Sequence, residues 1–338
     1  MTKGPNQKLK MLYLKDIFEK ETDDDHSLSL AEITEKLNER GVNADRKTLY
    51  ADFDELQRYG LDIIQSSNGR GCVYHLGERE FELPELKLLV DSVQAARFIS
   101  EKKSGDLIKK LMALTSKGQL EGLKRQVVLA GRVKTENPSV LANVDRLHQA
   151  INQKIQVRFH YMKWDIHKNL VPRNQGNWFQ VSPGLMILSD ENYYLAAYYA
   201  QAEEIRHYRV DKIKELKLLP NEKLPEKAVK AFKDLDVAQY ADTHFGMFNG
   251  DRTRVEFKIS NSKVGIFIDR FGKDIMLIPT GPDTVTTTIS VDVSDQFLGW
   301  IMALGPDVEI MNPPSLRKRM QDLGKRLLEQ YPEQYKEK

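Results

Sequence analysis

The sequence predicts a multidomain α+β protein, and three observations support this fold class. Apolar residues recur at helical spacing through most of the first 153 residues, and short aromatic and β-branched segments replace them from Ile155. Strands alternate with helices after residue 250. The length of 338 residues is enough for two or three domains. We divide the chain into four predicted parts, 1–80, 81–153, 154–220 and 221–338.

Three helices are predicted at the N-terminus. Residues 8–20 place apolar side chains at helical spacing. Ser29 is a natural N-cap for a second helix, because Glu32 three residues later completes a capping box. Asp45 can cap a third helix, which ends at Gly60.

Two extended segments follow the third helix. The first begins at Ile63, the second contains Val73, and Asn68 and Gly69 between them form a strong hairpin signal. Three helices followed by a two-stranded wing are the layout of a winged helix-turn-helix domain. We therefore predict such a domain in residues 1–80.

The third helix would read DNA, because the second helix of a helix-turn-helix enters the major groove with its N-terminal residues at base edges. The candidate DNA-binding residues are Arg46, Lys47, Thr48 and Tyr50, together with Arg70 at the tip of the wing. The alternative is a plain amphipathic helix whose charges face the solvent.

The charge of the first part favours an oligomer. Residues 1–80 carry 12 Lys and Arg against 16 Asp and Glu. One domain with that balance has little nonspecific affinity for DNA, whereas two domains double the contacts. We expect a homodimer on double-stranded operator DNA, with interfaces in the helical linker and dimerisation region, 81–153, and in the C-terminal domain.

Composition and motifs exclude several classes of protein. One cysteine, Cys72, rules out an internal disulfide framework and a cysteine-rich zinc site, and it fits a reducing cytoplasm. No apolar run approaches a membrane span, and the N-terminus lacks the apolar core of a signal peptide. The sequence has no Gly-rich phosphate loop, nucleophile elbow or protease-type His-Glu motif. We expect no enzyme activity, catalytic residue, metal or cofactor.

Two other clusters receive structural interpretations. The acidic run Asp23, Asp24 and Asp25 lacks the glycine framework of a calcium loop, so we expect a solvated loop. The stripe formed by Phe297, Trp300 and Ile301 is assigned to a core.

A compact, strongly bent antiparallel sheet is predicted from Ile155 onward. The segments NWFQVSP, GLMILSD, NYYLAAYYA and RHYRVDKI are short and rich in aromatic and β-branched residues, with turns between them. Residues 154–219 carry 10 Lys and Arg against 7 Asp and Glu, so this part is more basic than the first. An α+β domain is expected in residues 221–338.

These motifs resemble the WYL family of bacterial transcription regulators. Tyr193, Tyr194 and Leu195 match its Trp-Tyr-Leu signature with one substitution, and RHYRVDKI is similar to its Arg-x-Phe-Arg-x-Asp-Arg-Ile strand. RKTLYADFDEL resembles a pattern of the N-terminal winged domain that accompanies WYL domains, and residues 252–331 resemble the extension that follows them. Gly184 departs from the pattern, because an aromatic residue often stands there.

The resemblance implies an Sm-like small β-barrel with a pocket of basic and aromatic residues. Its ligand class would be single-stranded DNA, nucleic-acid fragments or nucleotides, since aromatic rings stack on bases and cations hold phosphates. The candidate ligand-binding residues are Tyr161, Ser182, Tyr193, Arg206, His207, Arg209 and Lys212.

Strand alternation leaves the role of RHYRVDKI open. It places His207, Arg209 and Asp211 on one face and Arg206, Tyr208 and Lys212 on the other, and both faces cannot line one pocket. We favour Arg206, His207 and Arg209 near the pocket. The alternative is that Arg209 and Asp211 are structural partners.

The expected function is a ligand-responsive, DNA-binding transcription regulator in the cytoplasm. Ligand binding would change the spacing of two DNA-binding domains in the dimer. The alternative is an accessory or regulatory subunit of a nucleic-acid-processing system for defence or repair, in which the sheet domain binds a single strand.

Overall fold

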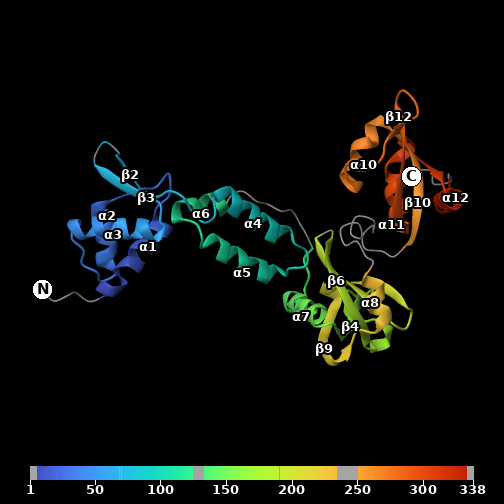
Figure 1. Cartoon of the computed structure of the whole chain (residues 1–338), viewed down its shortest axis with the longest axis horizontal. Helices are drawn as coiled ribbons and strands as arrows, with labels where there is room; N and C mark the ends of the chain where they lie inside the picture. The colour runs from blue at the N-terminus through green and yellow to red at the C-terminus, as the bar shows by residue number, and fades with distance from the viewer. Residues whose placement is uncertain are drawn as a thin grey trace, which may run out of the picture. The chain divides into compact units, whose positions relative to one another are not determined.

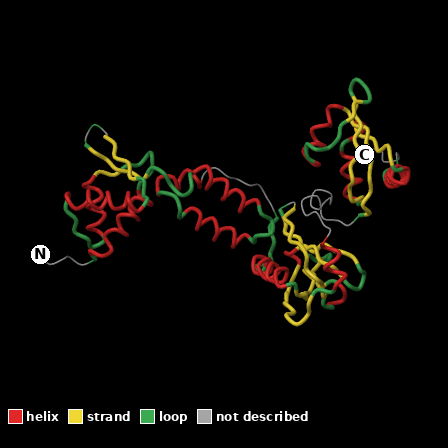
Figure 2. The backbone as a smooth tube through the Cα atoms, viewed as in Figure 1, coloured by secondary structure: helices red, strands yellow, loops and turns green. Residues whose placement is uncertain are grey.

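The computed structural model describes residues 6–67, 69, 71–124, 133–189, 191–233 and 250–332. Arg70, the predicted wing-tip contact, and Asn68 lie outside these residues. The chain divides into two compact units, Met1–Pro138 and Ser139–Lys338. Helices dominate the first unit and strands are concentrated in the second (Figures 1 and 2). Within the described ranges no helix has the apolar length that a membrane crossing requires.

The first unit begins with three helices and a small sheet. The helices are α1 (Lys10–Glu21), α2 (Leu30–Glu39) and α3 (Arg46–Tyr59), and the antiparallel strands are β1 (Leu28–Ser29), β2 (Ile63–Ser67) and β3 (Cys72–Leu76), in the order β1-β3-β2. Phe18 of α1, Phe53 of α3 and Tyr74 of β3 meet in the core. The Phe53 ring centroid lies 5.2 Å from that of Phe18 and 5.1 Å from that of Tyr74. Burial raises the pKa of Tyr74 to about 12.

Local hydrogen bonds fix the ends of these helices as the sequence predicts. The Ser29 hydroxyl accepts the Glu32 amide at 3.3 Å, and the Glu32 carboxylate accepts the Ser29 amide at 2.7 Å. The Asp45 carboxylate accepts the amides of Lys47 and Thr48, which satisfies donors that a helix start leaves without intrahelical partners. Gly60 ends α3 at a φ of 111°, where a side chain would be strained.

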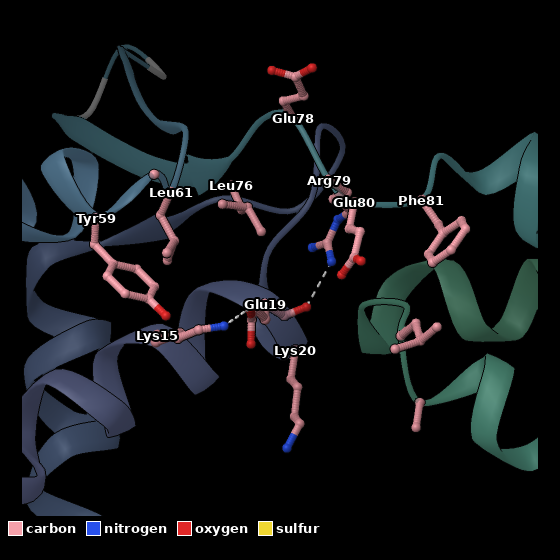
Figure 3. A pocket seen from close by; sticks show the side chains of 13 residues that line it. Lys15, Glu19, Lys20, Tyr59, Leu61, Leu76, Glu78, Arg79, Glu80 and Phe81 are labelled. Carbon is pink, nitrogen blue, oxygen red and sulfur yellow. Dashed lines mark hydrogen bonds and ion pairs between the residues drawn. The ribbon is translucent and has the colours of Figure 1, made fainter.

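Helices α4 (Leu83–Ala95), α5 (Glu101–Met112) and α6 (Lys117–Lys124) complete the first unit. Arg79, between β3 and α4, donates to the carbonyl oxygens of Glu19 at 2.9 Å and Thr22 at 2.5 Å. A hollow of about 330 Å³ lies beside it, between α1 and the segment 78–81 (Figure 3). Both basic and acidic side chains line this hollow, so its lining favours neither an anionic nor a cationic ligand.

The acidic loop after α1 is not fully solvated, and the expectation for Asp23 is wrong. Asp23 is 1% exposed, whereas Asp24 beside it has a side chain 78% exposed. One Asp23 oxygen lies 2.7 Å from His26 Nδ1, and the other accepts a short hydrogen bond from the Ser116 hydroxyl, just before α6. A Cβ atom on Gly118 would lie 2.3 Å from the His26 ring, so α6 packs closely on this loop. Asp23 therefore fastens α6 to the loop after α1.

Replacing Asp23 with alanine should lower the free energy of unfolding of the first unit by about 2–3 kcal/mol, because buried hydroxyl and amide donors lose their acceptor. Burial alone would raise the pKa of Asp23, but hydrogen bonds from Ser116 and His26 outweigh it and hold that pKa below its ordinary value. The stabilisation is therefore complete above the ordinary pKa and is lost as pH falls through the lowered pKa of the folded state.

Urea denaturation at pH 7 and at pH 3 measures this difference. Asp24→Ala is the matched control and should change the unfolding free energy by less than about 0.5 kcal/mol, because its side chain is exposed. Equal stability of the two variants at pH 7 would contradict the role of Asp23.

A curled antiparallel sheet and helix α7 (Val140–Gln153) begin the second unit. The strands are β4 (Ile155–Trp164), β5 (Leu170–Pro172), β6 (Phe179–Ser189), β7 (Asn192–Tyr199), β8 (Glu204–Arg209) and β9 (Ile213–Lys223), in the order β5-β4-β6-β7-β8 with β9 also paired to β4. Asn143 and Arg146 of α7 donate to the carbonyl oxygens of Ile213 and Leu216, at 3.0 and 3.3 Å. α7 is thereby fastened to β9 (Figure 1).

Helix α8 (Glu226–Lys233) packs closely against the glycine at position 184. The pairing of β6 with β7 shifts register at Gly184, which lies between Pro183 and Leu185. A Cβ atom at Gly184 would lie 2.3 Å from the Phe232 ring, so only glycine leaves room for that ring. The Phe232 ring of α8 thus occupies the space that a side chain at position 184 would need.

The C-terminal part is a four-stranded antiparallel sheet with three α-helices among the described residues. Its strands are β10 (Asp251–Ser260), β11 (Ile278–Pro279), β12 (Thr284–Val293) and β13 (Val308–Asn312), in the order β11-β12-β10-β13, and its helices are α10 (Val264–Phe271), α11 (Asp295–Ala303) and α12 (Pro314–Gln330). Phe297 and Ile301 are buried and Trp300 packs against them, which confirms the predicted core stripe.

Candidate ligand pocket and DNA-binding helix

A hollow of about 530 Å³ opens on the curled sheet of the second unit. It is lined by Lys163, Arg173, Asn174, Phe179, Tyr199, Gln201 and Arg206. Small-ligand sites commonly measure roughly 300–1,000 Å³. The lining residues come from β4, the turn after β5, and β6 to β8, so the curl of the sheet brings them together.

Aromatic rings form the floor of this hollow. The Phe179 ring centroid lies 6.2 Å from that of Tyr199 and 6.0 Å from that of Tyr208. The ring centroids of Phe159 and Tyr161, both on β4, each lie 6.2 Å from that of Phe179. Burial raises the pKa of Tyr208 well above its ordinary value, so its phenol stays neutral. Of these rings, Phe179 and Tyr199 line the hollow itself, and an aromatic face there can stack against a planar ligand.

Two arginines lie over rings of this floor. The Arg206 guanidinium lies 4.3 Å from the Tyr199 ring centroid, and that of Arg173 lies 5.6 Å from the Tyr161 centroid. Arg206 Nε also donates to Glu204 at 2.7 Å, in an exposed ion pair. Exposed pairs contribute only about 0–1 kcal/mol, so an incoming phosphate can displace Glu204.

The turn after β5 holds Arg173 in place. The Arg173 amide donates to the Tyr161 carbonyl oxygen at 2.7 Å, which ties the turn to β4. Asn174 and Gln175 have φ angles of 54°, and Gly176 has one of 86°. This left-handed backbone is uncommon outside glycine and asparagine. It reverses the chain and leaves the Arg173 side chain over the pocket floor.

Arg209 has a bracing geometry, in contrast to Arg206. Its guanidinium donates to both carboxylate oxygens of Asp211, at 3.0 and 2.9 Å, and to Asn192 at 2.9 Å. Asp211 is 6% exposed. Burial alone would lower the pKa of Arg209, but the hydrogen bonds and charge of Asp211 raise it. The Arg209 amide also donates to the Tyr161 hydroxyl at 3.1 Å, so the phenol is engaged with β8.

Strand pairing separates the other predicted ligand residues from the hollow. Arg206 pairs with Ala197 and His207 with Ala196, so their side chains point to opposite faces of the sheet. Ser182 is buried opposite Tyr198 on the face of His207. These two residues therefore lie on the face of the sheet away from Arg206.

Two further predicted residues lie apart from the lining. Tyr193 precedes Tyr199 by six positions on β7, which is about 20 Å along an extended strand. The Lys212 ammonium lies 4.8 Å from the ring centroid of Trp164. Of the seven candidates, Arg206 lines the hollow and Tyr161 forms part of its floor.

Two domain families match the second unit. The model of the WYL domain matches residues 142–218, and that of the WCX domain matches residues 251–328. The chain therefore contains a WYL domain and a WCX domain. The matched WYL residues include most of α7 and all residues that line the hollow. No curated protein matches the chain.

The solved structures that are similar to the chain include the two that follow. One is proteasome accessory factor B/C (PafBC) of Arthrobacter aurescens, with a TM-score of 0.29 and 17% identity over 96% of this chain and 49% of that chain. The other is described as a CRISPR Cas-related protein, with a TM-score of 0.40 and 15% identity over 75% of this chain and 72% of that chain. The chain thus spans about half the length of the first structure.

We call this hollow, with the seven residues that line it, the WYL pocket, and sequence reasoning missed most of its lining residues. Alternation from Tyr161 along β4 would have indicated Lys163, and alternation along β7 would have indicated Tyr199. Arg173 and Gln201 lie in turns, where no periodic signal marks the direction of a side chain. Their roles depend on the curl of the sheet.

The predicted DNA-binding residues share the exposed N-terminal end of α3. Lys47 is exposed, and Arg46 donates to the Tyr50 hydroxyl at 3.3 and 3.4 Å. The Thr48 hydroxyl accepts from the Lys10 ammonium at 3.0 Å and donates to the Asp45 carbonyl at 2.9 Å, so the fold already uses it. Arg46, Lys47 and Tyr50 thus present two cations and a hydroxyl beside a helix N-terminus, which itself attracts phosphate.

Proposed function

We propose that the chain is a DNA-binding transcription regulator whose WYL domain senses a nucleic-acid fragment or nucleotide and modulates operator binding. The observation that carries this proposal is the WYL pocket, in which two arginines lie over an aromatic floor. Stacking on the floor would hold a base of any identity, and Arg173, Arg206 and Lys163 would hold its phosphates. A small carboxylate metabolite would leave the aromatic rings of the floor without a stacking partner.

The first unit supplies the DNA-reading part of the proposal. Its three helices and the β2–β3 hairpin suit a winged helix-turn-helix domain, with α3 in the major groove. The curled sheet of the WYL domain suits an Sm-like small barrel. A homodimer would place two copies of α3 on a two-fold operator, and ligand binding would act by favouring one spacing of the two copies.

Gel-shift titration of the full chain against an operator selected from random duplexes tests the proposal. Increasing amounts of a short single-stranded oligonucleotide should change the apparent operator affinity at least fivefold, which is the scale of ordinary allosteric coupling. A constant operator affinity at oligonucleotide concentrations that saturate the WYL pocket would contradict the sensing role. The same preparation should leave a labelled strand uncut in the presence of Mg²⁺ or Mn²⁺, because we assign no catalytic step to the chain.

Arg46→Ala and Lys47→Ala should each weaken operator binding. A base-reading arginine contributes about 1–3 kcal/mol and its loss relaxes specificity, whereas a phosphate-bound lysine mainly changes the salt dependence. Arg58→Ala is the matched control, because Arg58 is an exposed cation near the other end of the same helix and pairs with Glu55. If the Arg46→Ala, Lys47→Ala double variant bound the operator as tightly as Arg58→Ala does, α3 would not be the recognition helix.

A further inference from the structure

A buried cation joins the first helix of the chain to α3. Lys10 is the first residue of α1, and it is 7% exposed. Its ammonium forms an ion pair with Asp52 of α3 and donates a hydrogen bond to the Thr48 hydroxyl at 3.0 Å. Thr48 and Asp52 are about one helical turn apart on α3, so both lie on the face that meets Lys10. We call Lys10, Thr48 and Asp52 the α1–α3 clamp.

Stability alone does not account for the α1–α3 clamp. The side chains of Lys10 and Asp52 are only 9% and 21% exposed. Taking two such charges out of water costs free energy that their attraction often fails to recover, and an apolar pair of similar volume is frequently as stable. Thr48 also lies in the first turn of α3, where the helix dipole disfavours a nearby cation. The best-attested use of a buried charge pair is to fix the register of two packed elements.

The clamp gives α3 a direction that apolar packing lacks. The buried residues of α3 are Leu49, Phe53 and Leu56. Apolar contacts are non-directional, so they resist small rotations and slides of a helix only weakly. A slide by one residue moves a helix about 1.5 Å along its axis, which takes a side chain out of hydrogen-bond range of a base edge or a phosphate. A cation held by two groups one turn apart favours a single rotation and height of α3.

The candidate DNA-reading side chains share this turn of α3. Arg46, Lys47 and Tyr50 each lie within two positions of Thr48, and all three are exposed. The Thr48 hydroxyl donates in turn to the Asp45 carbonyl oxygen at 2.9 Å, and the Asp45 side chain caps the helix. The clamp is therefore connected to the whole N-terminal end of α3.

We infer that Lys10 is a positioning residue for operator recognition. It acts through Thr48 and Asp52, and it sets the rotation and height at which α3 presents its exposed N-terminal side chains. Lys10 itself is buried, so it acts without touching DNA. Thr48 belongs to the clamp rather than to the direct DNA contacts. The inference rests on the proposed function, because it requires α3 to be the recognition helix.

Lys10→Met, Asp52→Leu in the full chain tests this role, because it replaces the ion pair with apolar side chains and leaves the net charge unchanged. Gel-shift titration should give an affinity for a random duplex within about twofold of wild type, since nonspecific binding follows charge. Operator affinity should fall by about tenfold or more, the scale of one lost base contact. The urea midpoint should not fall. Lys15→Met is the matched control, because the Lys15 ion pair lies within α1, and it should keep the wild-type ratio of the two affinities.

A double-mutant cycle separates positioning from direct contact at Thr48. Thr48→Val removes the hydroxyl and keeps the shape of the side chain. Its effect on operator affinity should nearly vanish when Lys10→Met and Asp52→Leu are already present, because the clamp is then broken. Additive effects would make Thr48 a direct DNA contact and would overturn the inference.

Three other results would also overturn it. The first is wild-type operator specificity in the folded Lys10→Met, Asp52→Leu variant, and the second is an equal loss of affinity for both duplexes. The third is failure of that variant to fold, because the pair would then serve stability rather than register. Failure of the proposed function gives a different result, since Arg46→Ala, Lys47→Ala would then retain operator binding.

Discussion

Arg209→Ala is expected to lower the free energy of unfolding of the second unit by about 3 kcal/mol. Removing one partner of a buried ion pair typically costs 3–5 kcal/mol, because the remaining charge is left in a poorly solvated site. We take the low end of that range, since the Arg209 side chain retains 39% exposure. Asp211, whose side chain is buried, would lose both hydrogen bonds from this guanidinium, and Asn192 would lose one. Thermal and urea denaturation of the full chain measure the loss.

A double variant makes this prediction specific. Arg209→Ala, Asp211→Ala removes both charges, so it should recover part of the stability that Arg209→Ala loses. Arg206→Ala is the matched control, three positions away on the same strand, and should change the unfolding free energy by less than about 0.5 kcal/mol because its pair with Glu204 is exposed. If Arg209→Ala kept wild-type stability and lost nucleotide binding, Arg209 would be a ligand residue rather than a brace.

Arg173→Ala, Arg206→Ala is expected to weaken binding of a 5′-phosphorylated thymidine dinucleotide by more than a hundredfold. A hydrogen bond to a charged group contributes about 1.5–3 kcal/mol, and two such contacts would be lost together. The rings beneath both arginines remain in place, so the floor and its stacking should survive. Isothermal titration calorimetry of the full chain measures the affinity, and a melting curve of each variant checks that the fold is intact.

The control for this prediction lies on the other side of the sheet. Arg158→Ala, Lys217→Ala removes the same number of cations from the same domain and should leave dinucleotide affinity within about threefold. Lys163→Ala, at the rim of the pocket, should weaken binding by a smaller factor, because lysine offers a point charge rather than a two-pronged fork. Similar affinity in the two double variants would remove the pocket as the dinucleotide site.

The sequence alone determined the features that depend on neighbouring residues. The caps at Ser29, Asp45 and Gly60 were predictable because each involves groups within about one helical turn. The buried stripe at Phe297 and Ile301 followed from helical periodicity. The WYL resemblance rested on short strand motifs, and the matched domain contains them.

The tertiary structure decided which of these residues meet. Asp23 is buried because Ser116, 93 positions later, returns to it, and no local pattern reports such a closure. Arg206 faces the pocket while Arg209 braces the sheet, since pairing to Ala197 and Tyr194 fixes opposite faces. Arg173 reaches the floor through a left-handed turn. Periodicity and capping act over a few residues, whereas a pocket is assembled by register and curvature among strands far apart in the chain.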